Sequence, residues 1–344
     1  MPVNTVNGEI SANELGITDV HEHILCNFLK DFKKPREVTK QILSEQKVSM
    51  EHLGILTINQ FAIKDNLIFN DENLAERELM EFKKAGGKTI VDATPADTGR
   101  DPIALKRISN VLGINIIAAT GFYRKRYHLK KVHSMSMEEI SDWMIKEIEV
   151  GIDDTGIKAG IIGELGTSEE IDSDEEKVLK SAAKVNKKLG IPVMVHLEPW
   201  KRLALDVLKI LSNNGANLEK VYLCHLDDNF YDYKYYTNIL KTSAYIGFDT
   251  FGELATLDPV FRCPSDSERI ELLLKLIEDG YGEKILLGCD VCRKRQLHKY
   301  GGWGYDHFLS NIIPVLRKKG MMEKEIQMLT IENPKNYLNV EKTA

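Results

Sequence analysis

The amino-acid sequence predicts a (β/α)8 barrel, formed as one domain by residues 1–344, with long loops at the C-terminal face of the barrel. Eight short apolar runs recur along the chain, and most are apolar at consecutive positions, which is typical of parallel strands covered on both faces. Segments with helical periodicity lie between these runs. The competing fold, an open doubly wound sheet, usually carries a Gly-rich phosphate-binding turn after its first strand, and this sequence has none there.

The predicted strands are short and rich in β-branched residues. After the first of them, residues 27–70 form a long charged insertion, which we expect at the functional face of the barrel. In chain order the predicted strands are GITDVHEHI (16–24), TIVDATP (89–95), NIIAATGFY (115–123), AGIIGELG (159–166), IPVMVHLE (191–198), KVYLCHLD (220–227), AYIGFDTF (244–251) and ILLGCD (285–290).

The predicted helices show apolar residues on one face and end signals of known chemistry. A capping box pairs a serine with a glutamate three residues later at the start of a helix, and glycine or proline marks the end. The predicted helices include 75–82, ended by Gly86-Gly87; 136–148, with the capping box Ser136–Glu139; 173–189, with the capping box Ser173–Glu176; and 323–332, ended by Asn333-Pro334.

Composition limits the classes of protein that the sequence can specify. The chain is 43% hydrophobic, enough for a large core, and its net charge of −6 gives no sign of the strongly basic surface that binds nucleic acid. No apolar run approaches the length of a membrane span, and the N-terminus shows no basic and apolar leader. Five cysteines with a single Cys-x-x-Cys pair indicate free thiols in a reducing compartment. We therefore expect a cytoplasmic protein that binds neither nucleic acid nor membranes.

Ligand-type side chains gather at the C-terminal ends of the predicted strands. His21 and His23 share one face of the first strand because residues i and i+2 point the same way, whereas Glu22 points to the opposite face. Since the strand ends of a barrel converge on one mouth, we expect six such side chains to meet there. They are His21, His23, Glu164, His196, His225 and Asp290.

Four imidazoles and two carboxylates are more ligands than one tetrahedral ion requires. They suit two divalent ions about 3.5–4 Å apart that share a bridging carboxylate and activate a water molecule. The alternative, that a strand-end histidine only packs or makes a hydrogen bond, suits each histidine alone but not the whole set. The remaining five histidines are expected at the surface: His52, His128, His133, His298 and His307.

The motifs around these ligands resemble those of the phosphotriesterase family of the amidohydrolase superfamily. The resemblance spans almost the whole chain, and its motifs together are highly specific. They are GITDVHEHI, GGKTIVDATPADTGRDP (86–102), ATGFY (119–123), TGIKAGIIGELGTS (155–168), VHLEP, CHLDD and the terminal GYDHFL and ENPKNYL.

This resemblance implies a role for each predicted ligand. His21, His23 and Asp290 would hold the more buried ion, and His196 and His225 would hold the more exposed one. Glu164 would bridge the ions, as in the subset of the family that has glutamate in place of a carboxylated lysine. The ions are expected to be zinc, with manganese and other divalent ions as alternatives. Asp290 would also accept the proton of the metal-activated water and return it to the leaving group.

Two further residues have roles implied by the resemblance. Tyr123 would hydrogen-bond the bridging hydroxide or the substrate oxygen, with ordinary packing as the alternative. Asp228 would relay a proton behind Asp290, or it would cap the loop after the sixth strand. Members specialised for organophosphates carry a histidine where this chain has Thr250, which argues against a dedicated phosphotriesterase.

Basic residues crowd the predicted mouth and favour an anionic substrate, with a solvated rim as the alternative. Arg124 and Arg293, each in a run of three basic residues, are predicted to bind that substrate. Some members that the chain resembles open phosphorylated sugar lactones. In them, a lysine beyond the seventh strand and an Arg-x-x-Tyr motif after the eighth strand are expected to hold the phosphate. Here Glu253 stands at the first position, and Gln296 replaces the tyrosine.

Together these features predict a binuclear metal hydrolase of a small molecule, and the resemblance implies a homodimer. The leading substrate is a carboxylic ester or lactone, including a phosphorylated sugar lactone, with promiscuous phosphotriesterase activity. The alternatives are an N-acyl amide hydrolase of the same family, a TatD-like metal-dependent nuclease, and a binding protein on an inactive barrel. The acidic composition argues against the nuclease, and the complete ligand set argues against the inactive barrel.

Overall fold

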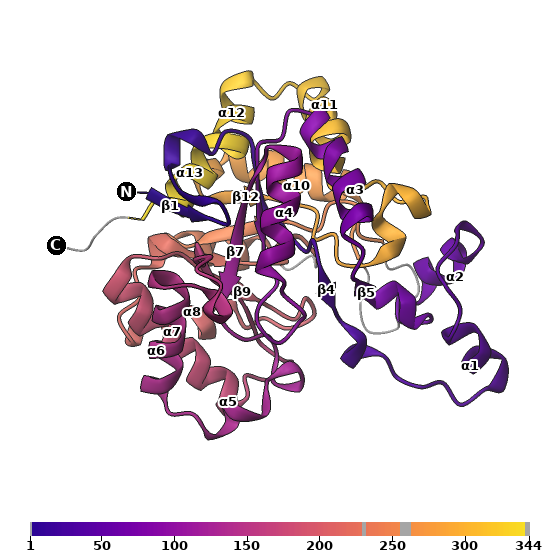
Figure 1. Cartoon of the computed structure of the whole chain (residues 1–344). Coiled ribbons are helices and arrows are strands. Elements are labelled where there is room, and N and C mark those ends of the chain that lie inside the picture. The colour runs from indigo at the N-terminus through magenta and orange to yellow at the C-terminus, as the bar shows by residue number, and fades with distance from the viewer. Residues whose placement is uncertain (1, 229–231, 255–262, 341–344) are drawn as a thin grey trace.

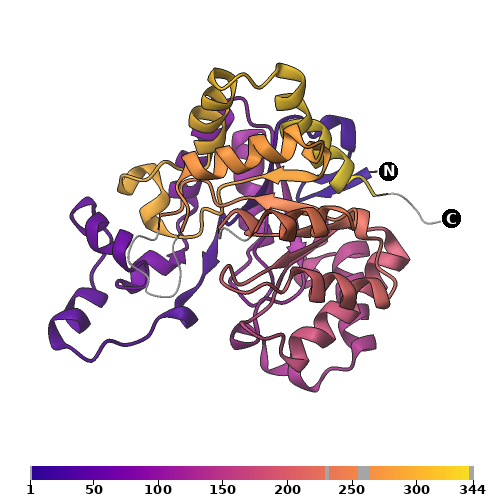
Figure 2. The same ribbon diagram turned by 180° about the vertical axis from the view of Figure 1, so that it is seen from behind.

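The computed structural model describes residues 2–228, 232–254 and 263–340. Eight parallel strands form one sheet in the order β12-β11-β10-β9-β8-β7-β6-β3, with helices around it (Figures 1 and 2). Each predicted strand segment contains one of these strands, so the predicted barrel is confirmed. The strands are β3 (Thr18–Glu22), β6 (Thr89–Asp92), β7 (Asn115–Thr120), β8 (Ile161–Gly166), β9 (Val193–His196), β10 (Val221–Leu223), β11 (Tyr245–Phe248) and β12 (Ile285–Leu287).

The first and last strands of this sheet approach each other and nearly close the barrel. The amide of Asp290 donates to the carbonyl of His21 at 3.2 Å. The buried carboxylate of Glu22 accepts hydrogen bonds from the amides of Cys289, at 2.9 Å, and Val291, at 2.7 Å. Glu22 therefore joins the two edges of the sheet and holds the residues on both sides of Asp290.

Apolar side chains fill the barrel below its polar mouth. The N-terminal hairpin of β1 (Pro2–Thr5) and β2 (Gly8–Ser11) lies beside the last helix, α13 (Asn333–Leu338), at the opposite end from the mouth (Figure 1). Val3 and Tyr337 from these segments pack in one buried cluster with Ile117, Ile161 and Met194 of the strands. Apolar side chains therefore dominate this end of the barrel, whereas the candidate ligands lie at the C-terminal strand ends.

The surrounding helices bury their apolar faces against the outside of the sheet. The surrounding helices are α3 (Glu72–Lys84), α4 (Pro102–Leu112), α5 (Lys130–Ser134), α6 (Met137–Glu149), α7 (Ser173–Leu189), α8 (Ala204–Asn213), α9 (Tyr233–Leu240), α10 (Asp266–Glu278), α11 (Ile313–Lys318) and α12 (Glu323–Gln327). Within the described ranges, every helix is too short or too polar to cross a lipid bilayer.

The predicted capping box of α6 is confirmed, whereas that of α7 is displaced by one residue. Asp172, not Ser173, is the N-cap of α7, because its carboxylate accepts from the amide of Asp174 and Glu175 reaches back to the Asp172 amide. Aspartate caps as well as serine does, so the sequence offered two registers of the same motif. The helix ends at Gly190, as predicted, with φ of +69°.

The prediction that the last helix ends before Asn333-Pro334 is wrong. A π-helical turn over Met328–Glu332 follows α12 and leads directly into α13. The hydrogen-bonding register changes at this turn, and Pro334 lies in the first turn of α13, where its missing N–H has no helical partner to lose.

The charged insertion forms an arm at the mouth of the barrel, as predicted. Its base is closed by β4 (Cys26–Asn27), which pairs antiparallel with β5 (Ile68–Phe69). The short helices α1 (Val38–Ser44) and α2 (Leu53–Ile58) extend away from the barrel (Figure 1). The arm matters for function because residues near its base contribute to the wall of the central cavity.

We expect Glu22→Ala to lower the free energy of unfolding by roughly 2–5 kcal/mol, because two buried amides lose their only carboxylate acceptor. Chemical denaturation followed by circular dichroism measures this change. The matched control is Glu9→Ala, an exposed carboxylate on β2, which should change stability by less than about 0.5 kcal/mol. Equal stability of Glu22→Ala and the wild type would show that the junction between the first and last strands of the barrel does not depend on this side chain.

Candidate metal centre

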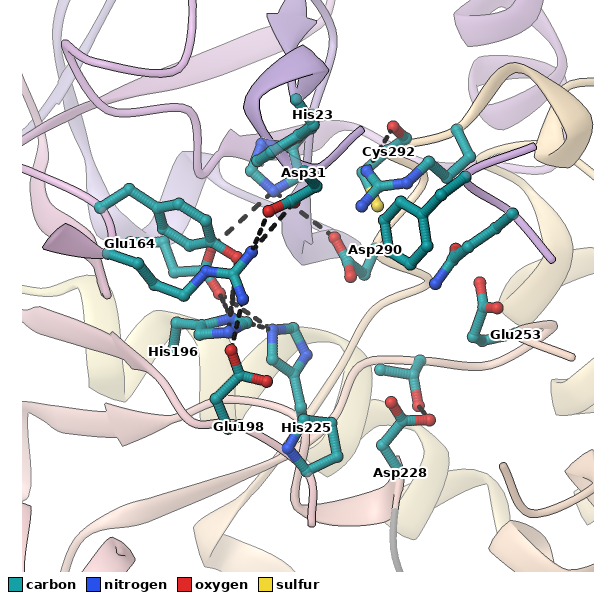
Figure 3. Close-up of a pocket in the computed structure, with 18 of the residues that line it drawn as sticks. His23, Asp31, Glu164, His196, Glu198, His225, Asp228, Glu253, Asp290 and Cys292 are labelled. Carbon is teal, nitrogen blue, oxygen red and sulfur yellow. Dashed lines mark hydrogen bonds and ion pairs between the residues drawn. The ribbon is translucent and has the colours of Figure 1, made fainter. Parts of the chain in front are cut away.

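A cavity of about 180 Å³ opens at the C-terminal ends of the strands (Figure 3). Five of the six predicted ligands line it, and the sixth, His21, is fully buried against them. The structure therefore brings together side chains from β3, β8, β9 and from the segments that follow β10 and β12. The lining ligands are His23, Glu164, His196, His225 and Asp290.

Glu164 lies between all four histidines. Its Oε1 atom is 3.0 Å from Nδ1 of His196, 2.9 Å from Nε2 of His225 and 3.6 Å from Nε2 of His21. Its Oε2 atom is 3.9 Å from Nε2 of His23. This is the position that a bridging carboxylate requires.

Asp290 completes the group formed by the first strand. Its Oδ1 atom is 3.6 Å from Nε2 of His21 and 3.4 Å from Nε2 of His23. The Asp290 side chain is 21% exposed, whereas those of the two histidines are at most 2% exposed, so this carboxylate faces the cavity. The candidates thus form two groups that share Glu164: one contains His21, His23 and Asp290, and the other contains His196 and His225.

The backbone departs from regular geometry at three of these candidates. The register of β8 against β9 shifts between Ile162 and Leu165, and Glu164 lies inside that irregular stretch. Such irregularities re-aim a side chain. His225 and Asp290 adopt left-handed φ values of 59° and 46°, a conformation that costs a non-glycine residue about 1–3 kcal/mol. The fold retains this strain where the candidate ligands converge.

The outward ring nitrogens of three histidines also have defined neighbours. Nδ1 of His21 is 3.1 Å from one oxygen of Asp249, and Nδ1 of His225 is 3.3 Å from the other. Nδ1 of His23 lies 2.9 Å from the hydroxyl of Thr94. Carboxylate and hydroxyl partners of this kind typically orient metal-binding histidines. The sequence alone predicts no role for Asp249 or Thr94, although both lie near the C-terminal ends of predicted strands, as the ligands do.

The donor set fits two divalent cations. Neither ring nitrogen of His21 makes a hydrogen bond among the described residues, and its buried Nε2 lies 3.6 Å from both Glu164 and Asp290, so a cation could bind between these three side chains. His21, His23 and Glu164 place donor atoms within 4.8 Å of one another, and so do Glu164, His196 and His225. Imidazole nitrogen and carboxylate oxygen suit zinc, manganese and related ions.

The pKa values of the candidate ligands shift in both directions. Burial lowers the pKa of His21 and of His225, but the nearby carboxylates outweigh this effect and raise both. Burial lowers the pKa of His23 well below its usual value, which keeps the imidazole neutral as a metal ligand must be. Burial raises the pKa of Glu164, but His196 and His21 outweigh this effect and hold that pKa well below its usual range. Burial raises the pKa of Asp290 to about 7, against the opposing effect of His21.

Of the two other predicted catalytic residues, the structure brings one to the centre. The hydroxyl of Tyr123 lies 3.2 Å from Nδ1 of His196 and lines the cavity. Asp228 also lines the cavity, but its Oδ1 atom accepts from Thr250 at 3.2 Å and from Arg269 at 3.0 Å. Among the described hydrogen bonds, none joins Asp228 to Asp290, so no relay between them is visible.

The two predicted substrate-binding arginines differ in their partners. Arg124 is held between the carboxylates of Asp31, at 3.0 Å, and Glu198. Arg293 is buried on the cavity wall and, within the described residues, has no carboxylate within 4 Å. Its Nη1 donates to the carbonyl of Cys292 at 2.9 Å, and its Nε makes no hydrogen bond with the described part of the chain.

The other basic residues of the predicted mouth are also paired. A cation that is already paired with a carboxylate binds a substrate anion less readily. The four paired residues therefore differ from Arg293, which has no such carboxylate among the residues that the structure describes. The pairs are Lys125 with Asp172, Arg126 with Asp31, Lys294 with Asp65 and Arg295 with Glu253.

One of the histidines expected at the surface is buried. His307 is 7% exposed, stacks on Trp303 with ring centroids 5.2 Å apart, and lies 2.8 Å from a carboxylate oxygen of Asp266. The surface prediction for His307 is therefore wrong, because a loop tryptophan and a helix N-terminal acid cover the ring. Trp303 lies outside the cavity lining, whereas Trp200 belongs to it.

Comparisons with known proteins point to one family along the whole chain. A model of the phosphotriesterase family matches residues 1–338. An N-acetyltaurine hydrolase from Dictyostelium discoideum is 36% identical, with 98% of each chain covered. A resiniferatoxin-binding protein from Rhodobacter sphaeroides is 34% identical with a TM-score of 0.96, covering 99% of this chain and 96% of that one. A lactonase from Listeria monocytogenes is 25% identical with a TM-score of 0.80, covering 99% and 100%.

We expect Glu164→Ala to reduce bound divalent metal from about two ions per chain to at most one, because both groups of candidates lose their shared carboxylate. Elemental analysis after dialysis against zinc measures this. Glu198→Gln is the matched control: it also lies in the cavity wall but pairs with Arg124, so its metal content should equal that of the wild type. Unchanged metal content in Glu164→Ala would place the bridge elsewhere.

Proposed function

This chain belongs to the phosphotriesterase family, and from that premise we propose that it is a binuclear metal hydrolase of short N-acyl amides whose amine part carries an anionic group. N-acetyltaurine, named in the relative from Dictyostelium discoideum, is the representative substrate. The observation that carries the proposal is one buried arginine, Arg293, which lies in the same small cavity as the candidate metal ligands and has no ion pair with a described carboxylate within 4 Å.

The residues that would hold the ions follow from the two groups. His21, His23 and Asp290 would bind one ion, His196 and His225 would bind the other, and Glu164 would contact both. Two divalent ions at such a site supply hydroxide near neutral pH and polarise a carbonyl oxygen. We propose zinc as the first ion to be tested, because nitrogen-rich carboxylate sites bind it readily.

The side chains around the centre supply the proton and the orientation. Asp290 is the more exposed carboxylate of the set, and the described ion pairs with His21 and His23 involve only its Oδ1 atom, so Oδ2 would take a proton and deliver it to the leaving amine. An amide needs this donation more than an ester does, because an amine anion is a poor leaving group. The Tyr123 hydroxyl, 3.2 Å from His196, would donate to the oxygen of the substrate carbonyl. For Asp228 we propose a positioning role through Thr250 and Arg269.

The cavity limits the size and charge of the substrate. Its volume of about 180 Å³ lies below the roughly 300–1,000 Å³ typical of sites for drug-sized ligands. The guanidinium of Arg293 lies 4.8 Å from the ring centre of Phe28 and 5.7 Å from that of Phe61, so aromatic faces shield it from water. A sulfonate or carboxylate on the amine would meet this buried cation, while the acyl carbonyl lay at the ligand cluster.

The expectation of an ester or lactone as the leading substrate gives way here to the amide alternative. The relative with the higher sequence identity carries the name of an amide hydrolase, whereas the lactonase is only 25% identical. The charges of the cavity also disfavour a phosphorylated lactone, whose phosphate carries more negative charge than a sulfonate. Arg295 is paired with Glu253, so among the described residues that line the cavity it offers no second cation beside Arg293. The nuclease alternative finds no support in the small cavity or in the family match.

We expect the zinc-loaded protein to release acetate and taurine from N-acetyltaurine faster than it opens γ-lactones or cleaves single-stranded DNA. Product formation is measured by NMR or mass spectrometry on one preparation. The metal-free protein and Glu164→Ala serve as controls and should be inactive. Faster turnover of a lactone, or activity that survives complete chelation, would contradict the proposal.

We expect Arg293→Met to raise KM for N-acetyltaurine by roughly 10–150-fold, the equivalent of the ~1.5–3 kcal/mol of a charge-assisted hydrogen bond. For the neutral analogue N-acetylethanolamine, the same variant should change KM less than about threefold, because no anion is lost. Lys125→Ala is the matched control: this rim lysine pairs with Asp172 and lies outside the cavity lining. A similar KM change for both substrates would show that Arg293 does not bind the anionic group.

A further inference from the structure

One carboxylate outside the predicted ligand set contacts both halves of the candidate centre. Asp249 follows β11 and is fully buried. Its Oδ2 atom lies 3.1 Å from Nδ1 of His21, and its Oδ1 atom lies 3.3 Å from Nδ1 of His225. His21 belongs to the group with Asp290, and His225 belongs to the group with His196. Asp249 therefore spans the centre from behind, on the side away from the cavity lining.

Other contacts fix this carboxylate in place. The hydroxyl of Tyr222 donates to Oδ2 of Asp249. The amide of His225 donates to Oδ1 at 2.9 Å, which also supports the left-handed backbone of that residue. The amide of Asp249 itself donates to Asp227 at 3.3 Å. These contacts hold both oxygens of Asp249 in place beside the two rings.

The geometry determines which nitrogen of each ring faces the cavity. With Nδ1 of both rings beside Asp249, Nε2 of both rings faces Glu164, at 3.6 Å for His21 and 2.9 Å for His225, and so lies on the side where an ion would bind. His196 differs, since it presents Nδ1 to Glu164 at 3.0 Å. Among the described hydrogen bonds of the four histidines, Thr94 takes part only in that of His23.

We propose that Asp249 is a positioning residue that sets the tautomer and orientation of one histidine in each half of the binuclear centre, and so governs the affinity of both ions. This inference rests on the two-ion function proposed above. It distinguishes Asp249 from Thr94, whose contact is confined to one half. It also assigns a role to Tyr222, which fixes the shared carboxylate rather than any ligand.

The first test uses the wild-type protein. In metal-free protein at pH 9, ¹⁵N NMR of the histidine rings should show a proton on Nδ1 of His21 and on Nδ1 of His225, with signals assigned by single histidine-to-glutamine variants. Because neighbouring groups fix the position of a ring proton, an unprotonated Nδ1 on either ring would overturn the proposal. This measurement needs neither bound metal nor activity.

The second test compares Asp249→Asn with Thr94→Val by competition with zinc chelators of known affinity. A carboxamide offers an acceptor to only one ring, so Asp249→Asn should weaken binding of both ions by roughly 10–100-fold, as is typical of lost outer partners. Thr94→Val should weaken one ion and leave the other unchanged.

Wild-type affinity at either site of a folded Asp249→Asn protein would overturn the proposal. If the variant does not fold, the wild-type NMR measurement decides. If the wild-type protein binds no divalent ion, the proposed function fails, while the ring tautomers still test the role of Asp249.

Discussion

The structure depends on the burial of one carboxylate, Glu164, among four imidazoles at the end of an apolar barrel. An ion removed from water costs several kcal/mol unless opposite charge surrounds it, so this carboxylate requires cations or polarised donors on every side. The requirement accounts for the irregular backbone nearby. The bulge at β8 and the left-handed residues His225 and Asp290 bring side chains to points that regular strands do not reach.

A second layer of contacts holds that arrangement in place. Glu22 joins the sheet edges on both sides of Asp290, and Asp249 stands behind the two halves of the centre. In the cavity wall, too, buried charges are paired with opposite charges. Arg124 is paired with Asp31 and Glu198, whereas Arg293 has no described carboxylate within 4 Å. A substrate anion is the partner that this arrangement lacks, and this is why charge on the substrate enters the proposed function.

The barrel and the convergence of the ligand set could be predicted from the sequence, because both follow from local order along the chain. Histidines at i and i+2 of a strand share a face, and the ends of parallel strands meet at one mouth. The partners of Glu22 and Asp249 could not be predicted, since they lie in segments far away in sequence. The same limit left Arg124 and Arg293 equivalent in the sequence, because their difference lies in the carboxylates that reach them through space. The cap of α7 and the helical course through Pro334 were missed for a local reason, as two signals competed within a few residues.

Two cations bound by these six side chains, with Glu164 between them, would be visible in a crystal structure of the zinc-loaded protein. Anomalous diffraction is measured on both sides of the zinc absorption edge. We expect two anomalous peaks, one in contact with His21, His23 and Asp290 and the other with His196 and His225, with Glu164 in contact with both. A single peak, or peaks that Glu164 does not touch, would contradict this binding mode.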